Sequence, residues 1–574
     1  MTFFRPIIAA AVALSLGACQ TTTAPAPIVQ TGVVEAADPR AADAGREMLR
    51  RGGSATDAAI AVMLALTVVE PQSSGIGGGG FMLRALPDGT ITTYDGRETA
   101  PAAAGPDWFL DENGEPYASR EIVRTGLSVG VPGNIALAAR AHAAHGRLAW
   151  AELFEPAIAL AEGFVMNPRL HQSLDGSIDR AGLDAGMRAT FYEPNGEPFA
   201  VGTVIRRPDL AETFRRLAAE GPDAMYGEEA AEALAAHVAA NTPRAAGMVA
   251  ADITGYEARE REAVCGFYRA YRICSMGPPT SGGIMLLQTL GQLERFDLSA
   301  LGPQSVEFWH LFLQSEMLAW ADRAAYAADS DFVQVPTQAL VSPEYLAGRS
   351  QLIDPARAAE SYPAGDVESL LAMRGLGQGP MEQGTTHFVA VDSEGAMVSY
   401  TSTVEGGFGS GLAFGGYHLN NELTDFSFVP ENDGVPVANR VESGKRPRSS
   451  MSPTIVWDPD GEPFLIIGGA GGPFIPVQTA RSIIGVIDFD LALEDAFAQP
   501  IVMGFGPVIF VEEGTWLAGQ TDALAALGYD NIRTGPQPFG SVGQVGALRV
   551  GDEWITAYDP RFRGRIEATP IMLD

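Results

Sequence analysis

The chain has 574 residues, of which 46% are hydrophobic and 19% are charged, a balance typical of a globular protein that buries a large core as one unit or as two domains. Its formal net charge at pH 7 is −32. This charge argues against nucleic-acid binding and against electrostatic attachment to anionic lipid, because both require a basic surface.

The first residues have the pattern of a targeting segment. Arg5 precedes an apolar run that is too short to span a bilayer and that ends in Leu16-Gly17-Ala18-Cys19. This ending resembles a bacterial lipobox, which would be cut before Cys19 so that the cysteine carries lipid and holds the acidic protein at a membrane. We therefore expect a lipoprotein signal peptide over residues 1–18, a tether over 19–35, and an exported protein of the periplasm, anchored to the outer membrane of a Gram-negative bacterium. A plain secretory signal cut after the alanine is the alternative.

The spacing of apolar residues predicts two helices between residues 36 and 71, separated by Gly52-Gly53. A glycine run over residues 75–80 then precedes a predicted strand over 81–85. The run is not a phosphate loop, because no Gly-Lys-Ser/Thr follows it. We expect it to let backbone segments pass close to one another.

Gly126-Leu127-Ser128-Val129-Gly130 matches the nucleophile elbow of serine hydrolases letter for letter. The elbow requires a helix that starts directly after its serine. Here Pro132 and Gly133 intervene, and the helix is predicted to follow them. The match therefore argues only weakly for a serine nucleophile. The amphipathic helices predicted over residues 150–260 indicate no chemistry.

Two cysteines flank a predicted tight turn at Arg269-Ala270. A hairpin about this turn pairs Cys265 with Cys274 at a site where the Cα atoms lie close enough for a disulfide, which suits an exported protein. Zinc is a weaker interpretation, since two cysteines without a matching histidine leave its ligand shell incomplete. The sequence therefore predicts a structural disulfide and no metal.

A long helix is predicted over residues 307–326, and residues 354–384 are weakly periodic and contain Gly and Pro. A hairpin follows, with a three-residue loop that ends in Gly395, where a positive φ is needed. Counting outwards from this loop places Thr385 directly opposite Thr403, with both side chains on one face of the sheet.

Two facing hydroxyls directly after a glycine suit a threonine nucleophile. If the chain were cut between Gly384 and Thr385, the new α-amine would lie on the same residue as the hydroxyl and could act as its base. The alternative is an ordinary edge strand, because threonine is common in strands.

Motifs along nearly the whole chain resemble the γ-glutamyltransferase (glutathione hydrolase) family of N-terminal-nucleophile hydrolases. Each motif alone is a weak signal, whereas their number and order make a strong one. The matching segments are Gly77-Gly78-Gly79-Gly80-Phe81-Met82, Asp95-Gly96-Arg97-Glu98-Thr99-Ala100-Pro101, Pro278-Pro279-Thr280-Ser281-Gly282-Gly283, Gly384-Thr385-Thr386-His387, Asn420-Asn421-Glu422-Leu423-Thr424-Asp425-Phe426 and Lys445-Arg446-Pro447-Arg448-Ser449-Ser450-Met451-Ser452-Pro453-Thr454.

The resemblance sharpens the expected fold. Strands and helices that alternate in both halves fit a layered sandwich. The family implies an α+β fold, a four-layer αββα sandwich, made of a large subunit (36–384) and a small catalytic subunit (385–574) that arise from one self-cleaved precursor and form one intertwined globular unit. It implies no metal and no organic cofactor.

The resemblance also assigns the site. Thr385 would cleave the bond after Gly384 and then attack the γ-glutamyl amide of glutathione or a related compound, and Thr403 would steady its hydroxyl. The glycine-rich segment between a predicted strand and helix supplies backbone N–H groups, so Gly471 and Gly472 would form the oxyanion hole. The substrate has a carboxylate and an ammonium: Arg97, Ser449 and Ser450 would bind the first, and Glu405, Glu422 and Asp425 the second.

Several positions depart from the family pattern. Glu405 stands where some members have Asn, Glu422 where some have Gln, and Gly469-Ala470 where Ser-Pro is common, which leaves the geometry of the oxyanion hole open. The loop over residues 426–445 has no Tyr to act as a lid. One alternative is a β-lactam (glutaryl-cephalosporin) acylase with the same nucleophile, which needs no ammonium site. A non-catalytic surface lipoprotein on the same scaffold is the other.

Overall fold

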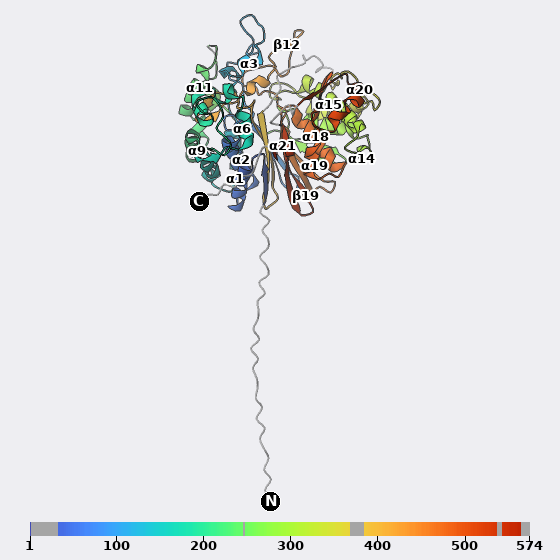
Figure 1. Ribbon diagram of the computed structural model, residues 1–574, viewed down its shortest axis with the longest axis horizontal. Coiled ribbons are helices and arrows are strands. Elements are labelled where there is room, and N and C mark those ends of the chain that lie inside the picture. The colour runs from blue at the N-terminus through green and yellow to red at the C-terminus, as the bar shows by residue number, and fades with distance from the viewer. Residues whose placement is uncertain (2–31, 245–246, 368–383, 536–541, 564–574) are drawn as a thin grey trace.

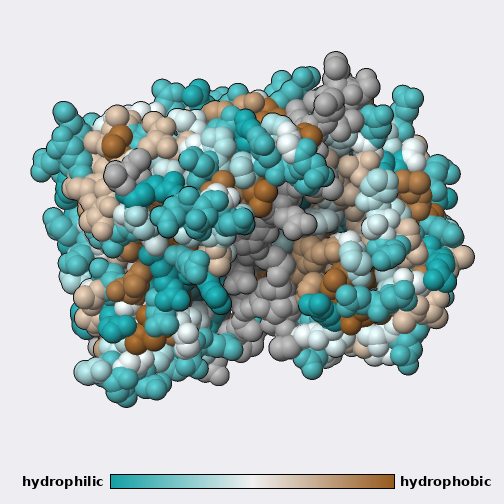
Figure 2. Space-filling view, turned by 90° about the horizontal axis from the view of Figure 1, so that it is seen from above, coloured by the Kyte–Doolittle hydropathy of each residue, from teal (hydrophilic) through white to brown (hydrophobic). Residues whose placement is uncertain are grey.

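The computed structural model describes residue 1 and residues 32–244, 247–367, 384–535 and 542–563. The expected signal peptide and Cys19 lie outside these residues, as does much of the expected tether. In the described ranges, no helix is long and apolar enough to cross a membrane, and no group of His, Cys, Asp and Glu side chains could hold a metal ion. Figure 2 shows a face that is largely hydrophilic, with small separate hydrophobic patches.

Two sheets form the centre of the molecule. The first has five strands in the order β1-β8-β9-β2-β3, and the second has six in the order β20-β19-β15-β14-β7-β6. The strands of the first are β1 (Val33–Ala36), β8 (Gly384–Val391), β9 (Met397–Glu405), β2 (Gly79–Ala85) and β3 (Ile91–Asp95). Those of the second are β20 (Glu553–Tyr558), β19 (Gly543–Val550), β15 (Pro463–Ala470), β14 (Thr454–Trp457), β7 (Tyr271–Ser275) and β6 (Val264–Tyr268). Both sheets combine strands from either side of Gly384.

Helices cover the outer face of each sheet, on opposite sides of the molecule in Figure 1. Against the first sheet pack α1 (Pro39–Arg50), α2 (Ala55–Val69), α4 (Asn134–His145), α5 (Glu155–Glu162), α6 (Pro168–Leu174), α7 (Ile178–Ala181), α8 (Ala185–Phe191), α9 (Pro208–Glu220), α10 (Asp223–Tyr226), α11 (Glu228–Ala240) and α12 (Ala250–Thr254). Against the second pack α13 (Gly282–Leu293), α14 (Leu298–Leu301), α15 (Val306–Tyr326), α16 (Thr337–Leu340), α17 (Pro343–Ser350), α18 (Phe474–Ile487), α19 (Leu493–Ala498) and α20 (Thr521–Ala526).

A third apolar cluster fills the space between the sheets, where Leu83 and Val389 of the first meet Ile455, Ile466 and Val545 of the second. Helix, sheet, sheet and helix therefore follow one another as four layers, which confirms the predicted αββα sandwich. Short elements complete the described chain: α3 (Ser119–Ile122), α21 (Pro560–Arg563), β4 (Phe164–Val165), β5 (Val204–Ile205), β10 (Ala413–Phe414), β11 (Tyr417–His418), β12 (Glu431–Asn432), β13 (Val435–Pro436), β16 (Val502–Phe505), β17 (Val508–Glu512) and β18 (Asn531–Gly535).

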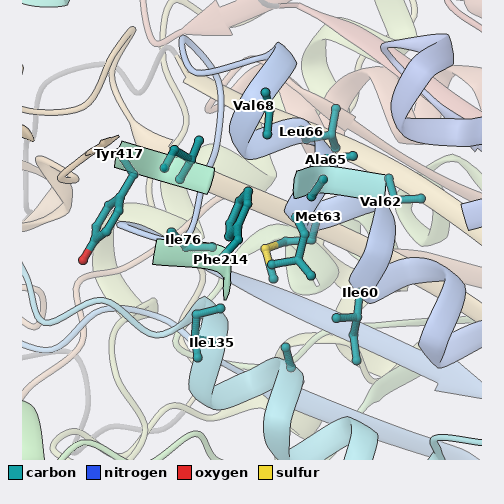
Figure 3. Packing of buried hydrophobic residues seen from close by; sticks show 14 of the residues in the cluster. Ile60, Val62, Met63, Ala65, Leu66, Val68, Ile76, Ile135, Phe214 and Tyr417 are labelled. Carbon is teal, nitrogen blue, oxygen red and sulfur yellow. The ribbon is translucent and has the colours of Figure 1, made fainter. Parts of the chain in front are cut away.

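Helix α2 is the most deeply buried helix against the first sheet, and all of its 15 residues are buried. Its sequence is apolar on every side, as expected of a helix that is covered all round. A capping box between Ser54 and Asp57 begins it. Figure 3 shows its side chains packed with Ile135 of α4, Phe214 of α9 and Tyr417 of β11. This core packs against the outer face of β8 and β9, the strands that carry the site.

The hairpin β8–β9 lies in the middle of the first sheet, and it has the register that the turn predicts. Gly395 has φ +81°, the Asp392 N–H donates to the Ala396 carbonyl, and Thr385 pairs with Thr403. The register shifts between Gly384 and Thr385, where a bulge interrupts the ladder. Bulges are common next to active sites, because they redirect a side chain.

Two further sequence interpretations concern local geometry. Cys265 and Cys274 are paired residues of β6 and β7 and form a disulfide, with Cα atoms 4.1 Å apart. Ser128 is buried in a 3₁₀ turn, and its hydroxyl donates to the carbonyls of Val123 and Thr125. A serine held in this way is no exposed nucleophile, so the match to the serine-hydrolase elbow is coincidental.

Candidate active site

Thr385 is the second residue of β8, and its hydroxyl lies against the peptide bond that joins it to Gly384. Thr385 Oγ1 donates to the Gly384 carbonyl oxygen at 2.7 Å and lies 3.4 Å from Thr403 Oγ1. The Thr403 hydroxyl also donates to the Gly384 carbonyl and accepts from the Glu405 N–H at 2.8 Å. Thr403 was predicted to steady the Thr385 hydroxyl; in the uncut chain its shorter contact is to the carbonyl. A donor at that oxygen polarises the carbonyl for attack.

Gly384 is required at this place on steric grounds. A Cβ built on it would lie 2.7 Å from the Glu405 carbonyl oxygen and 2.8 Å from the Gly406 backbone. A larger residue would push the two strands apart at the bond that Thr385 faces. The glycine therefore keeps the carbonyl, the two threonine hydroxyls and the bulge in register.

A buried histidine lies on the same face of β8, two residues beyond the nucleophile. His387 Nδ1 is 2.8 Å from Thr401 Oγ1, and Nε2 is 3.4 Å from Ser399 Oγ. Burial lowers the pKa of His387 to about 3. An imidazole with so low a pKa and with both nitrogens engaged is a poor base at neutral pH. The α-amine that a cut would create remains the base best placed for Thr385.

Arg97 forms the charged centre of the site. It lies just after β3, is 1% exposed, and its two terminal nitrogens pair with Glu422 and Asp425. It also donates to the carbonyl oxygens of Pro447 at 3.2 Å and Arg448 at 2.9 Å. The predicted carboxylate clamp and two of the predicted ammonium ligands thus form one buried ion-pair cluster. Both signs of charge are in place for a zwitterionic ligand.

Glu98, the next residue, is also completely buried beside this cluster. Burial raises its pKa to about 8, and the nearby Arg97 guanidinium opposes the rise. A neutral carboxyl therefore sits beside the ionised pairs below that pH. Its carboxyl lies over Gly79, where a Cβ would come within 2.5 Å of Glu98 Oε2. This contact explains the glycine at the start of β2.

Glu405 ends β9 with a φ of +72°, which is uncommon for a residue other than glycine. Its carboxylate accepts from Asn421 Nδ2, and Asn421 Oδ1 accepts from the Gly406 N–H at 2.9 Å. Backbone strain of this kind persists where surrounding contacts hold it, often at functional sites. Glu405 is thus fixed in direction by its neighbour.

The two serines predicted to bind a carboxylate lie in the segment before β14. Ser449 is paired with Thr280, and its hydroxyl accepts from the Met451 N–H at 3.1 Å. The Ser450 hydroxyl accepts from the guanidinium of Arg323 at 2.9 Å. Arg323 of α15 therefore reaches the site, although the sequence indicated only that it lies in a long helix.

Gly471 and Gly472 lie between β15 and α18 with φ of +116° and +57°, which favour glycine. Arg97, after β3, contacts the segment before β14, so these two strand ends lie together. Antiparallel pairing then puts the start of β8 and the end of β15 at the same end of the sandwich. Among the hydrogen bonds of the described residues, neither glycine N–H is a donor.

The structure brings the predicted residues of both sheets to one end of the sandwich and adds three that sequence reasoning left without a role. Asn421 stood inside a matched motif, and Arg323 in the long helix. Arg180, in α7, donates to Asn421 Oδ1 at 2.7 Å. It belongs to the helical stretch that gave no chemical signal, and no local pattern could have found it.

A threonine that follows the first glycine of a strand, faces a second hydroxyl and lies at one end of an αββα sandwich is typical of an N-terminal-nucleophile hydrolase. Residues 41–569 match the family described as gamma-glutamyltranspeptidase. The chain is 38% identical over 481 residues to the glutathione hydrolase proenzyme of Bacillus subtilis (strain 168), covering 82% of this chain and 80% of that protein. The chain belongs to the γ-glutamyltranspeptidase family.

Acylases are also among its relatives. It is 34% identical to the acylase ACY 1 proenzyme of Pseudomonas sp. (strain SE83), over 90% of this chain and 89% of that protein. The crystal structure of a cephalosporin acylase from Bacillus halodurans has a TM-score of 0.79 and 26% identity, covering 92% of this chain and 94% of that one. Membership of the family therefore leaves the choice of acyl group to the residues of the site.

Proposed function

We propose that the protein cuts itself between Gly384 and Thr385 and then transfers the γ-glutamyl group of glutathione or a related amide to water or to an amine. The observation that carries the proposal is the meeting of the Thr385 and Thr403 hydroxyls at the Gly384 carbonyl. Names among the relatives support it, since several are glutathione hydrolase proenzymes.

Self-cleavage begins when Thr385 Oγ1 attacks the Gly384 carbonyl carbon. Thr403 donates to the oxygen, the peptide C–N bond breaks, and the hydroxyl proton passes to the departing amine nitrogen. The resulting ester is hydrolysed by water, which leaves a carboxylate on Gly384 and a free α-amine on Thr385. This divides the chain into a large and a small subunit, each of which contributes strands to both sheets.

In turnover, the α-amine of Thr385 takes the proton of its own hydroxyl, which attacks the γ-carbonyl of the substrate. Backbone N–H groups of Gly471 and Gly472 bind the oxyanion, an effect of ~3 kcal/mol per donor. The protonated α-amine then donates this proton to the nitrogen of the leaving group as the amide C–N bond breaks, and a glutamyl ester remains on Thr385. Water or an acceptor amine then releases the glutamyl group.

The acyl group is chosen by charge. The α-carboxylate of a γ-glutamyl donor binds Arg97 and the two serines, and its ammonium binds Glu405, Glu422 and Asp425. A glutaryl group has no ammonium and would bring no cation to these acids, while its carboxylate would still compete with Glu422 and Asp425 for Arg97. Leaving buried carboxylates short of positive charge is costly. The acid-rich cluster around Arg97 therefore favours the γ-glutamyl donor over the acylase alternative.

Hydrolysis of γ-glutamyl-p-nitroanilide and glutaryl-p-nitroanilide by the purified protein tests the proposal, with denaturing electrophoresis and N-terminal sequencing. We expect two fragments, the smaller beginning at Thr385, and a clear preference for the γ-glutamyl donor. Thr385→Ala should remain whole and inactive. Ser393→Ala, an exposed hydroxyl at the far end of the same hairpin, is the matched control and should behave as wild type. An uncut wild-type chain would refute the nucleophile, and faster glutaryl hydrolysis would favour the acylase.

We further propose that the protein is exported and attached to a membrane through lipid on Cys19. The lipobox-like ending of the apolar run supports this location. Metabolic labelling with a fatty acid, compared between wild type and Cys19→Ala, distinguishes lipidation from plain secretion.

A further inference from the structure

Arg180 reaches the candidate site from a helix that carries none of the family motifs. It lies in α7, and its guanidinium makes two contacts with the other subunit region: Nε donates to the Gly409 carbonyl, and one terminal nitrogen donates to Asn421 Oδ1 at 2.7 Å. The side chain is therefore directed inward, across the cut between the two halves of the chain.

The glycine-rich loop after β9 is shaped around this arginine. A Cβ built on Gly406 would lie 2.2 Å from a terminal nitrogen of Arg180, and one on Gly411 would lie 2.7 Å from the Arg180 carbonyl oxygen. A side chain at Gly406 would displace the guanidinium, and one at Gly411 would press on the backbone of α7. The glycines of this loop thus make room for Arg180 directly beside Glu405.

Asn421 connects the arginine to the acid. Its Oδ1 accepts from Arg180 and from the Gly406 N–H, and its Nδ2 donates to Glu405 Oε2. An amide that accepts from a cation on one side becomes a stronger donor on the other, because hydrogen bonds in series polarise one another. The chain of contacts therefore holds the Glu405 carboxylate in one direction, on a backbone with positive φ.

We propose that Arg180 is a positioning residue for recognition of the donor's α-ammonium, acting through Asn421 on Glu405. The inference rests on the proposed function, in which Glu405 is one of the ammonium ligands. Arg180 does not touch the donor. It places a fixed positive charge next to the Asn421 amide, and the amide in turn orients the Glu405 carboxylate. The effect of Arg180 is therefore specific to ligands that carry the ammonium.

Competitive inhibition by L-glutamate and by glutarate separates this role from a purely structural one. The two ligands differ by the ammonium group alone. In Arg180→Met we expect the inhibition constant of L-glutamate to rise roughly 10- to 100-fold, the effect of losing a charge-assisted hydrogen bond. The constant for glutarate should change less than about threefold. Arg180→Lys, which keeps the charge but cannot span both acceptors, should fall between Arg180→Met and wild type.

Arg124→Met is the matched control. Arg124 is a neighbouring arginine that faces Asp179 at the surface, with a closest ion-pair distance of 3.8 Å, so its removal deletes the same charge without touching Asn421. Both inhibition constants should stay at wild-type values. The double variant Asn421→Ala, Arg180→Met should bind L-glutamate hardly more weakly than Asn421→Ala alone, because the two residues act in series.

Equal losses for glutamate and glutarate in both Arg180 variants would show that the arginine only fastens α7 to the loop, and unchanged constants would show that it has no role; either result overturns the inference. Failure of the proposed function looks different, since wild type would then bind glutarate at least as well as L-glutamate. If Arg180→Met remains uncut on a denaturing gel, the comparison is made with Arg180→Lys.

Discussion

Replacement of Thr403 by valine should slow self-cleavage while it preserves the shape of the strand. Valine keeps the β-branched side chain and removes only the hydroxyl, which donates to the Gly384 carbonyl and accepts from the Glu405 N–H. Loss of one donor to a developing oxyanion costs about 3 kcal/mol, which is roughly a 100-fold slower cut. The Glu405 N–H also loses its acceptor, and this lowers the free energy of unfolding by about 1–3 kcal/mol.

The rate is measured by refolding the purified precursor from denaturant and following the two fragments on a denaturing gel. Thr403→Ser restores a hydroxyl and should recover most of the rate. Thr401→Val is the matched control, because its hydroxyl lies on the same face of β9 but contacts His387 at 2.8 Å instead of the scissile carbonyl. A Thr403→Val precursor that cuts at the wild-type rate, or a Thr401→Val precursor that is slowed equally, would refute the reasoning.

Two further predictions concern stability. Burial raises the pKa of Glu98 from 4.5 to about 8, so between these pH values the folded state keeps a proton that the unfolded state releases. The free energy of unfolding therefore falls by about 1.4 kcal/mol for each unit by which the pH rises across this range. In the uncut Thr385→Ala background, Glu98→Gln should remove this slope, which urea unfolding at pH 5.5 and pH 8 measures; parallel pH dependences would contradict the assignment. Replacing Cys265 and Cys274 by serine opens a short loop and should cost about 2–3 kcal/mol in the same assay, and a variant as stable as its parent would show that the bridge adds nothing.

Much of the catalytic end could be predicted because it is local in sequence. The pairing of Thr385 with Thr403 depends on a three-residue loop with glycine in its last place and on the two-residue period of a strand. The pairing of Cys265 with Cys274 follows in the same way from one tight turn. Such geometry involves fewer than twenty residues, and no distant segment has to be placed.

Other parts of the site were found only through the family resemblance or only through the structure. Arg97 and Glu422 are 325 residues apart, and nothing in the spacing of either predicts that they pair. Arg180 lies in a stretch whose helices were predicted from amphipathic patterns, and an apolar face reports on the core and not on what the polar side chains reach.

The sequence by itself determined the β8–β9 hairpin with its register and the layered class of fold, which the family resemblance sharpened to αββα. Thr385 as the nucleophile stays a prediction. The tertiary structure alone decided which charges meet, that the Glu98 carboxyl is buried deeply enough to hold its proton, and that Arg180 stands behind Asn421 and Glu405. The physical reason is that turns and strand periods are encoded within a few neighbouring residues. Desolvation and ion pairing instead depend on every element that packs around a group, and these elements come from distant parts of the chain.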